Sequence, residues 1–174
     1  MKSKISMLLA AFLFFGLAAC GSTKTDPNAG RSCPETGFLK HTDEMTYDNK
    51  EYKLEAKIIN LTGGCSFDQA EVSMNVNLDF AGQWTARGME APKRIKLPYF
   101  ATVLDDQEDI LHKTRYETVL KMDDTLGLSS ETVSLRIPVA EGANAADYRV
   151  IFGFSVTPNQ FYDNQMQYQK DIKP

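Results

Sequence analysis

The chain of 174 residues has very few of the side chains that most often carry out catalysis or bind metals. It contains two histidines, three cysteines and one tryptophan. Zinc sites combine several cysteine and histidine ligands, and a nucleophilic triad needs a histidine beside a serine or cysteine. No Cys-x-x-Cys pair, Gly-x-Ser-x-Gly turn or glycine-rich phosphate loop is present. The sequence therefore indicates no enzyme, no metal and no cofactor.

The remaining candidates for catalysis or metal binding have simpler interpretations. His41 is isolated in the sequence, and His112 stands in an alternating segment, where a half-exposed strand position is expected. A pair of carboxylates of the glycosidase type stays an open alternative, because any two acids can meet in the folded chain. The acidic run Asp105–Asp109 has oxygens that suit Ca²⁺ but lacks the glycine of a calcium loop. We interpret this run as a solvated turn between two strands.

Long hydrophobic runs are also missing. The longest one, residues 7–19, is too short to cross a hydrocarbon core, which needs about 20 residues. It follows a short positively charged segment with Lys2 and Lys4. A charged start, a short apolar stretch and small residues at its end are typical of a secretory signal peptide, here residues 1–19.

The end of this segment, Leu17-Ala18-Ala19-Cys20, resembles the lipobox of bacterial lipoproteins. The resemblance implies cleavage between Ala19 and Cys20 and attachment of fatty acyl chains, such as palmitate, to Cys20. An ordinary signal with a chance cysteine is the alternative. Residues 20–32 are rich in Gly, Ser, Thr and Asn, which predicts a flexible tether to the membrane. Position 21 is Gly and not the Asp of an inner-membrane retention signal, which favours the periplasmic face of the outer membrane.

The two other cysteines, Cys33 and Cys65, form an even pair in an exported chain. Exported proteins meet an oxidising compartment, so a structural disulfide is expected. A redox site would more often show two cysteines separated by two residues, and a zinc site needs more ligands. We predict that the bridge joins the end of the tether to a turn at Gly63-Gly64.

Charge in the mature chain is acidic. Removal of the signal leaves 17 basic and 23 acidic residues. Binding to nucleic acids needs clustered Lys and Arg, so this balance argues against a nucleic-acid partner. The one basic cluster, Lys93-Arg94-Ile95-Lys96, is interpreted as a solvated strand edge.

Residues 33–174 have the length of one domain with a core of its own and are dominated by alternating apolar and polar positions. This period predicts about seven half-buried strands. They are expected near residues 38–41, 52–58, 72–80, 96–104, 111–122, 133–139 and 148–156. Turns are expected at Gly63-Gly64, Asp105-Asp106, Asp123-Asp124 and residues 142–144. The long connection 81–92, with Trp84 and Met89, is expected to be a mobile loop.

The predicted fold class is all-β, an antiparallel immunoglobulin-like β-sandwich, with a small barrel as the alternative. A short C-terminal helix is expected from Thr157-Pro158-Asn159-Gln160, which has a capping residue, proline at the first helical position and glutamine at the third. The helix would run to about Tyr168. Its apolar residues would cover one end of the fold, or Phe161, Tyr162 and Tyr168 would form a docking surface for a partner.

The order of short motifs is similar to that of a family of small alphaproteobacterial lipoproteins of unassigned function. The motifs lie between Cys33 and Gln165. They are, in order, Cys33-Pro34, Gly64-Cys65, Leu97 to Asp105, Arg136-Ile137-Pro138, Ala146-Asp147-Tyr148, Gly153-Phe154 and Thr157 to Gln160. The resemblance implies an exported, lipid-anchored β domain and implies no catalytic residue.

Two functions follow as hypotheses. The first is a non-enzymatic protein of the bacterial cell envelope that binds another envelope protein or scaffolds a complex, for example through a strand edge or the aromatic helix. The second is a binding module for a small or lipidic ligand, which needs a cavity of several hundred Å³. The oligomeric state is left open.

Overall fold

The structure is a computed structural model that describes residues 31–68, 70–140 and 143–172. The expected signal peptide, its cleavage site at Ala19 and Cys20, and all but the end of the tether lie outside the described residues.

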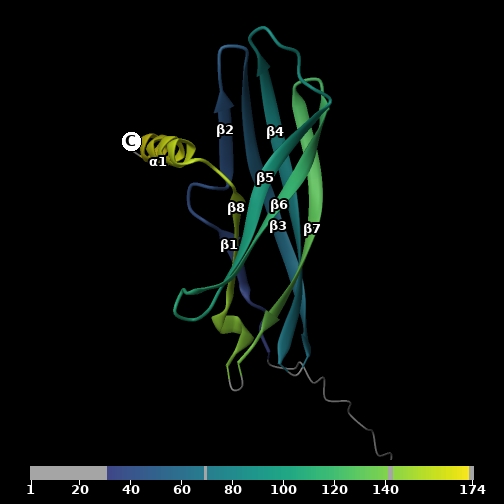
Figure 1. Cartoon of the computed structure of the whole chain (residues 1–174), viewed down its shortest axis with the longest axis vertical. Helices are drawn as coiled ribbons and strands as arrows, with labels where there is room; N and C mark the ends of the chain where they lie inside the picture. Colours follow the sequence, from purple (N-terminus) through teal and green to yellow (C-terminus); the bar gives the residue numbers. More distant parts are fainter. Residues whose placement is uncertain (1–30, 69, 141–142, 173–174) are drawn as a thin grey trace, which may run out of the picture.

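The described chain forms eight strands, one 3-10 helix and one α-helix (Figure 1). In chain order the elements are β1 (Glu35–Phe38), β2 (Glu44–Asp48), β3 (Tyr52–Asp68), β4 (Glu71–Ala86), β5 (Arg94–Leu104), β6 (Ile110–Asp123), β7 (Leu126–Pro138), η1 (Ala145–Asp147), β8 (Arg149–Phe154) and α1 (Pro158–Ile172). The chain is therefore mostly β with one C-terminal helix, as predicted.

All eight strands belong to one curled sheet in the order β1-β8-β5-β6-β7-β4-β3-β2. Neighbouring strands are antiparallel except β1 and β8, which are parallel. Strands β6 and β7 pair only over Lys121–Asp123 and Leu126–Leu128 and then diverge (Figure 1). The sheet thus has two halves of four strands, joined by a short stretch of pairing.

The inner surfaces of these two halves pack on each other. Phe80 of β4 lies 5.1 Å from the ring of Tyr99 on β5 and 6.0 Å from the ring of Phe154 on β8, measured between centroids. None of these strands is a neighbour of β4 in the sheet, so the contacts cross the core. Phe80, Phe154 and Phe152 are fully buried. Burial of large side chains at ~25 cal/mol per Å² is the main stabilising contribution to such a core.

The two outer strands of the sheet, β1 and β2, are joined by a turn, and this turn connects the two halves of the sheet at their open edges. The Phe154 amide donates to the Thr42 carbonyl at 2.7 Å, and the Ile58 amide donates to the Asp43 carbonyl at 2.9 Å. These bonds link β8 to β3 through two adjacent residues of the turn. The curled sheet is closed at this point by a loop and not by strand pairing.

The arrangement of two separate sheets is not confirmed, because one continuous sheet supplies both layers of the core. The predicted turn at Gly63-Gly64 is wrong. Strand β3 continues through both glycines, which pair with Val76 and Asn75 of β4. A side chain at Gly63 would lie 3.1 Å from the Asn75 carbonyl oxygen, so glycine at this position permits close approach of the strands.

The predicted loop over residues 81–92 is also wrong over its first half, because β4 continues to Ala86. Trp84 is buried and stacks on Tyr52 at 4.2 Å, and its indole nitrogen donates to the Met89 carbonyl at 3.2 Å. The alternation of buried and more exposed positions continues through Gly82 and Trp84, so the strand extends beyond the predicted end at residue 80. The connection that remains covers residues 87–93.

Other boundaries agree with the sequence. The turn at Asp105-Asp106 joins β5 to β6, and the turn at Asp123-Asp124 joins β6 to β7. Gly142 lies outside the described residues. The predicted disulfide is confirmed: Cys33 and Cys65 are bonded at 2.05 Å with their Cα atoms 5.8 Å apart. The bridge ties Cys33, which follows the expected tether, to β3 within a strand and not at a turn.

Candidate functional site

Helix α1 begins at the predicted capping box. The Gln160 amide donates to the Thr157 hydroxyl at 3.3 Å, and the Thr157 amide donates to the Gln160 side-chain oxygen at 2.8 Å. These reciprocal bonds satisfy two of the amide groups that a helix start leaves without partners. The helix continues to Ile172, one turn beyond the predicted end.

The helix contacts the body of the protein through polar side chains. Gln160, Asn164 and Gln165 are half-buried, and the other described side chains of α1 are exposed. Gln160 and Asn164 lie one turn apart and face the outer edge of β2. A helix on a globular domain normally buries its apolar face and exposes its polar face. In helix α1 the half-buried side chains are polar, and the apolar side chains are divided between the junction with His41 and the solvent.

The amide side chains of α1 occupy hydrogen-bonding groups of the edge strand. Gln160 Nε2 donates to the Thr46 carbonyl at 3.0 Å, and Asn164 Nδ2 donates to the Glu44 carbonyl at 2.8 Å. Strand β2 ends the sheet, so these alternate carbonyls point to the side where another strand would pair. Two side chains of the helix thus take the place of part of a neighbouring strand.

An aromatic contact supports the same junction. The ring of His41 lies 5.8 Å from Phe161 and 5.2 Å from Tyr168, both in edge-to-face geometry. Asn164 Nδ2 also donates to the His41 carbonyl at 2.9 Å. His41 has a φ of 67°, in the left-handed region that non-glycine residues rarely adopt. A strained turn residue therefore connects the sheet to the helix.

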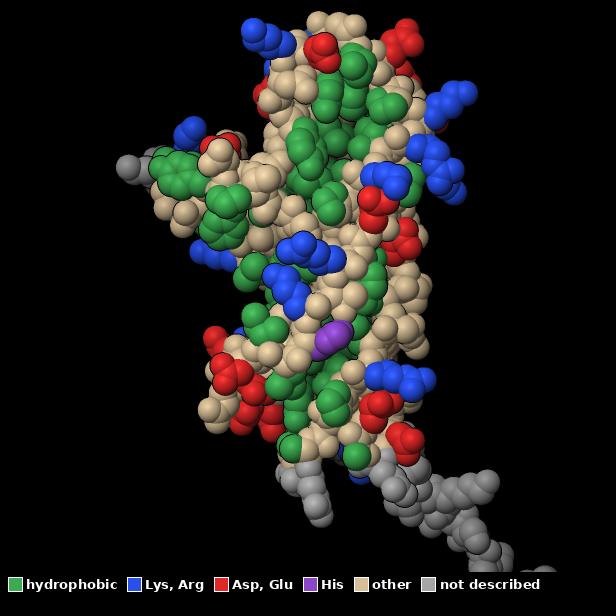
Figure 2. Space-filling view, viewed as in Figure 1, with side chains coloured by type: hydrophobic (Ala, Val, Ile, Leu, Met, Phe, Trp, Pro, Cys, Tyr) green, Lys and Arg blue, Asp and Glu red, His purple; other side chains and the backbone are tan. Residues whose placement is uncertain are grey.

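Two large apolar side chains lie on the side of α1 that faces away from the sheet. They are Tyr162 and Met166, one turn apart and 59% and 38% exposed, whereas Phe161 and Tyr168, 37% and 46% exposed, lie on the side that contacts His41. Hydrophobic side chains gather on the helix in Figure 2. Of the three residues that the sequence suggested for docking, Phe161 and Tyr168 pack on His41 in the turn between β1 and β2, and Tyr162 faces solvent. We expected Phe161 and its neighbours either to cover one end of the fold or to dock a partner, and both alternatives stay predictions.

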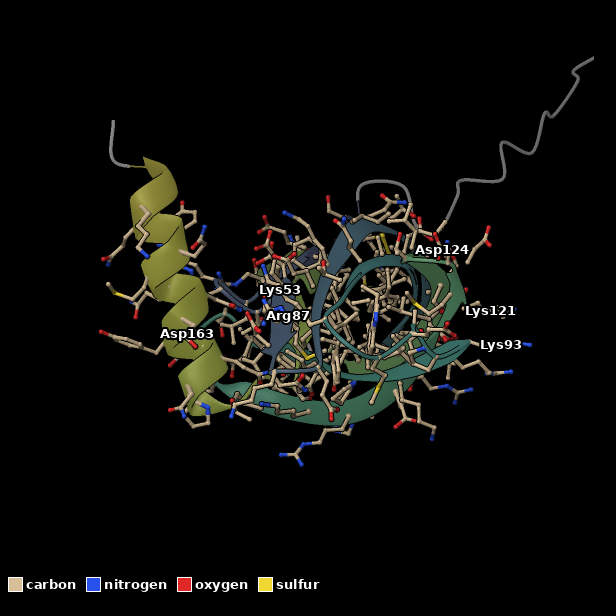
Figure 3. All side chains as sticks on the ribbon, turned by 90° about the horizontal axis from the view of Figure 1, so that it is seen from above. Lys53, Arg87, Lys93, Lys121, Asp124 and Asp163 are labelled. Atoms are coloured by element: carbon tan, nitrogen blue, oxygen red, sulfur yellow. A yellow bond between two sulfur atoms is a disulfide. The ribbon has the colours of Figure 1, made fainter. Side chains whose placement is uncertain are left out.

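A groove of about 730 Å³ runs between α1 and the edge of the sheet. Its sheet side includes Thr46, Asp48 and Lys53, and its helix side includes Gln160 and Asp163. Figure 3, seen along the long axis, shows Lys53 and Arg87 on the sheet side and Asp163 on the helix. The walls are polar, so the groove differs in character from the apolar outer surface of the helix.

Ion pairs fix the charges on the sheet side of this groove. Lys53 contacts Glu55 at 2.7 Å, and Arg87 donates to both Asp48 and the Asn49 carbonyl. The hydrogen bond from Lys57 to Glu44 raises the pKa of Lys57 above its ordinary value, against a smaller opposing effect of desolvation. These exposed pairs each contribute little to stability, and the pair of Lys57 with Glu44 joins β3 to the edge strand β2.

The other sequence candidates lie elsewhere and do not form a reactive cluster. His112 is exposed on β6, where its Nε2 lies 2.7 Å from the Thr114 hydroxyl. Asp105 accepts bonds from the amides of Gln107 and Asp109, which makes the acidic run a self-capped turn. Among the described residues, no group of three or more His, Cys, Asp or Glu side chains is placed to hold a metal ion.

Sequence reasoning missed β2 and the role of Gln160 and Asn164 as caps of its edge. The short alternation in Glu44–Asp48, with buried Met45, was the available signal for the strand. Glutamine and asparagine on a helix carry no signal of this kind, because the carbonyls that they bind lie more than 110 residues earlier in the chain.

Comparisons with protein-family models, with curated proteins and with solved structures found no match for this chain. Within the described residues, no helix is both long enough and apolar enough to cross a membrane.

Proposed function

We propose that this chain is a lipoprotein of the bacterial cell envelope, acylated at Cys20, that acts without catalysis by docking another envelope protein on helix α1. The observation that carries the proposal is the exposure of Tyr162 and Met166 on the side of α1 that faces away from the sheet. The amide side chains of α1 bind the sheet edge, and Phe161 and Tyr168 contact His41, so Tyr162 and Met166 are the apolar side chains left facing solvent.

The exposure of Tyr162 and Met166 calls for an explanation, because burial of these side chains against the domain would be favourable. Tyrosine and methionine at Tyr162 and Met166 are residue types enriched at protein interfaces. Each aromatic side chain that is buried by a partner contributes a large apolar area. A helix presented in this way is the form that an apolar groove on a second protein recognises.

The position of α1 relative to the tether favours a protein partner over the bilayer that holds the anchor. The disulfide fixes the end of the tether at Cys65 of β3. The edge strand β2 pairs with Lys53–Lys57 at the other part of the same strand. At ~3.3 Å per residue these points are roughly 30 Å apart. The tether would therefore attach at one end of the domain, and α1 would be presented away from it.

A binding module for a small or lipidic ligand is the second candidate, and the packing supports it less. The space between the two halves of the sheet is filled by side chains such as Phe80, Phe152 and Phe154. The groove beside α1 has polar walls, whereas ligand sites of this kind are mostly apolar. For the fold itself, we propose an immunoglobulin-like sandwich, because the two four-stranded halves of the sheet pack face to face.

The test is site-specific photo-crosslinking in living cells, with the full chain carrying a photoreactive residue at position 162 or, in a second strain, at position 166. We expect one discrete adduct of the same mass from both positions. Arg136 is the matched control, because it is exposed and lies on β7, which β4 and β3 separate from the edge strand β2 that holds α1. An antibody against the domain would detect the adducts, which avoids a tag next to the helix.

Two further measurements separate anchoring from docking. The intact mass of the purified protein reports the acyl chains on Cys20, and a Cys20→Ser variant that is still exported lacks them. Loss of the adduct in that variant supports a partner at the membrane. Absence of a discrete adduct at both 162 and 166, with the protein acylated, would contradict the docking proposal and leave anchoring intact.

A further inference from the structure

The outer surface of β5 and β6 carries an excess of basic side chains. Alternation puts Leu97, Tyr99 and Leu120 into the core, so the residues between them face outward. Arg94 pairs directly with Lys121 across the two strands. The outward cations of the two strands are Arg94, Lys96, Lys113, Arg115 and Lys121, all of them exposed.

Lys93 extends this group just before β5, and Figure 3 shows Lys93 and Lys121 pointing away from the sheet on the same side. Glu117, which contacts Lys96 at 2.7 Å, and Asp123 at the strand end are the acids on the outward side of these two strands. In Figure 2 Lys and Arg side chains follow the diagonal course of β5 and β6. We call these six cations the basic face.

The opposite half of the sheet has the reverse balance. Outward positions of β2, β3, β4 and β7 carry more acids than bases. The acids are Glu44, Asp48, Glu55, Asp68, Glu71 and Asp79, and the bases are Lys53, Lys57 and Arg136. Several of these groups neutralise each other, as Lys53 and Glu55 do. The charge of the chain is therefore unevenly distributed, with basic side chains in excess on the outward positions of β5 and β6 and the acidic turn Asp105–Asp109 at the end of these strands.

We propose that the basic face binds the anionic headgroups of the membrane that holds the lipid anchor, so that the domain lies along the bilayer surface. Basic side chains near an anionic surface are attracted within about one Debye length, roughly 8 Å at physiological salt. From Lys113 to Lys121 the basic face extends for roughly 25 Å at ~3.3 Å per residue. This length runs along the strands, so a domain on its side brings all six cations to the phosphate plane together.

The tether makes this contact efficient. A chain of twelve residues reaches on the order of 20 Å, which keeps the domain at a high effective concentration next to the lipid surface. Lipid anchors commonly act together with a polybasic patch as a second signal. Helix α1 projects from the side of the sheet and does not cover β5 or β6 (Figure 1). Lipid contact by the basic face leaves α1 accessible to a partner.

The experiment measures lysine acetylation rates by mass spectrometry on the full acylated chain, reconstituted in two kinds of vesicle. One kind contains phosphatidylcholine alone, and the other also contains phosphatidylglycerol. We expect Lys96, Lys113 and Lys121 to react at least about fivefold more slowly on the anionic vesicles, the scale of attraction for a single surface cation. Lys53 and Lys57 on the opposite half should react equally on both, and high salt should remove the difference.

Arginine variants test the basic face without changing the lysines that report on it. Arg94→Gln with Arg115→Gln should abolish most of the protection, whereas the matched change Arg136→Gln on the opposite half should leave it unchanged. All three positions are exposed, so the fold should be retained. Unchanged protection in the double variant would overturn the proposal.

The inference depends on the proposed anchoring, and intact mass keeps the two apart. If the purified chain carries no acyl group, the anchor proposal fails, and the soluble chain is then sedimented with the same two vesicle types. Binding to anionic vesicles alone supports the basic face as a lipid-binding surface. Equal labelling or equal binding on both vesicle types contradicts the lipid-binding role of the basic face. Protection of the same lysines by soluble polyglutamate alone also contradicts it and would assign the basic face to an acidic protein partner.

Discussion

The side-chain amide of Asn164 in helix α1 donates to the backbone carbonyl of Glu44 in β2 at 2.8 Å. One residue of the C-terminal helix thus satisfies an acceptor on the open edge of the sheet. Open edges are templates for pairing with other strands, and proteins block them with charges, bulges or a covering element. Here the covering element is held by hydrogen bonds and by the contacts of His41, so its attachment can be weakened without damage to the core.

Substitution of Asn164 should loosen α1 from the sheet edge without touching the capping box of the helix. Each net hydrogen bond contributes about 1 kcal/mol, so Asn164→Ala, which removes the bonds to the Glu44 and His41 carbonyls, should speed hydrogen exchange in residues 158–172 by roughly tenfold or more. The global unfolding free energy should change by less than about 1 kcal/mol, because the core is untouched. Gln169→Ala, an exposed glutamine on the same helix, is the control. Equal exchange in Asn164→Ala and the control would contradict the edge-capping role.

The disulfide should stabilise the domain strongly. Cys33 and Cys65 are 32 positions apart, and closing a loop of this length is worth about 3–4 kcal/mol in the chain-entropy model. The double variant Cys33→Ser, Cys65→Ser should lower the free energy of unfolding in urea by that amount, without loss of β structure by circular dichroism. A decrease below about 1 kcal/mol would contradict this prediction and would mean that residual contacts in the unfolded chain already restrict the loop between Cys33 and Cys65.

Gly153 of β8 should tolerate no side chain. A Cβ atom there would lie 1.9 Å from Thr42 Oγ1 and 2.8 Å from Thr42 Cβ, in the turn that connects the two halves of the sheet. Gly153→Ala should destabilise the protein by about 2–4 kcal/mol, because the turn has to move and its bond to Phe154 weakens. Gly64→Ala is the matched control, since a Cβ atom there meets no atom within 4 Å. Thermal unfolding of both variants measures the difference.

Tyr99 should make stability depend on alkaline pH. Burial raises the pKa of Tyr99 well above its ordinary value, with smaller contributions from the charge of Glu131 and from Tyr116. A raised folded-state pKa means that the stabilisation is complete below the unfolded value, about 10, and is lost as pH rises above it. The free energy of unfolding should therefore fall above about pH 10, and Tyr99 should ionise only when the protein unfolds.

Ultraviolet absorbance of tyrosinate and urea unfolding at several pH values test this prediction. Tyr99→Phe retains the ring beside Phe80 and should flatten the decrease in stability above pH 10. Tyr162→Phe is the control, because that side chain is exposed. The same alkaline decrease in all three proteins would show that another group is responsible.

Local sequence predicted the elements of this fold better than their arrangement. Alternation in residues 72–80 and the reciprocal caps of Thr157 and Gln160 act between near neighbours in the chain, so both could be identified directly. Strand β3 was cut short in the prediction, because Gly63-Gly64 is a turn signal in isolation. In the sheet these residues are held by Val76 and Asn75, which no local pattern reveals.

The candidate site could be predicted only in part, because its residues follow from local sequence but their orientation depends on contacts between distant segments. Phe161, Tyr162 and Tyr168 stand out on a helix by composition alone, and the sequence suggested docking as one use of them. The direction in which they point depends on where Gln160 and Asn164 find acceptors. Those acceptors belong to β2, a five-residue strand that the sequence did not predict.

By itself the sequence determined the β character of residues 33–174, the start of the helix and the pairing of Cys33 with Cys65. These depend on alternation, on capping chemistry and on the even number of cysteines left after Cys20. Only the tertiary structure decided that one curled sheet forms both layers, that Tyr162 of α1 faces solvent while Phe161 and Tyr168 contact His41, and that basic residues from β5 and β6 share a surface. The physical reason is that strand order and sheet curvature result from long-range packing, which sets neighbours that are far apart in the chain.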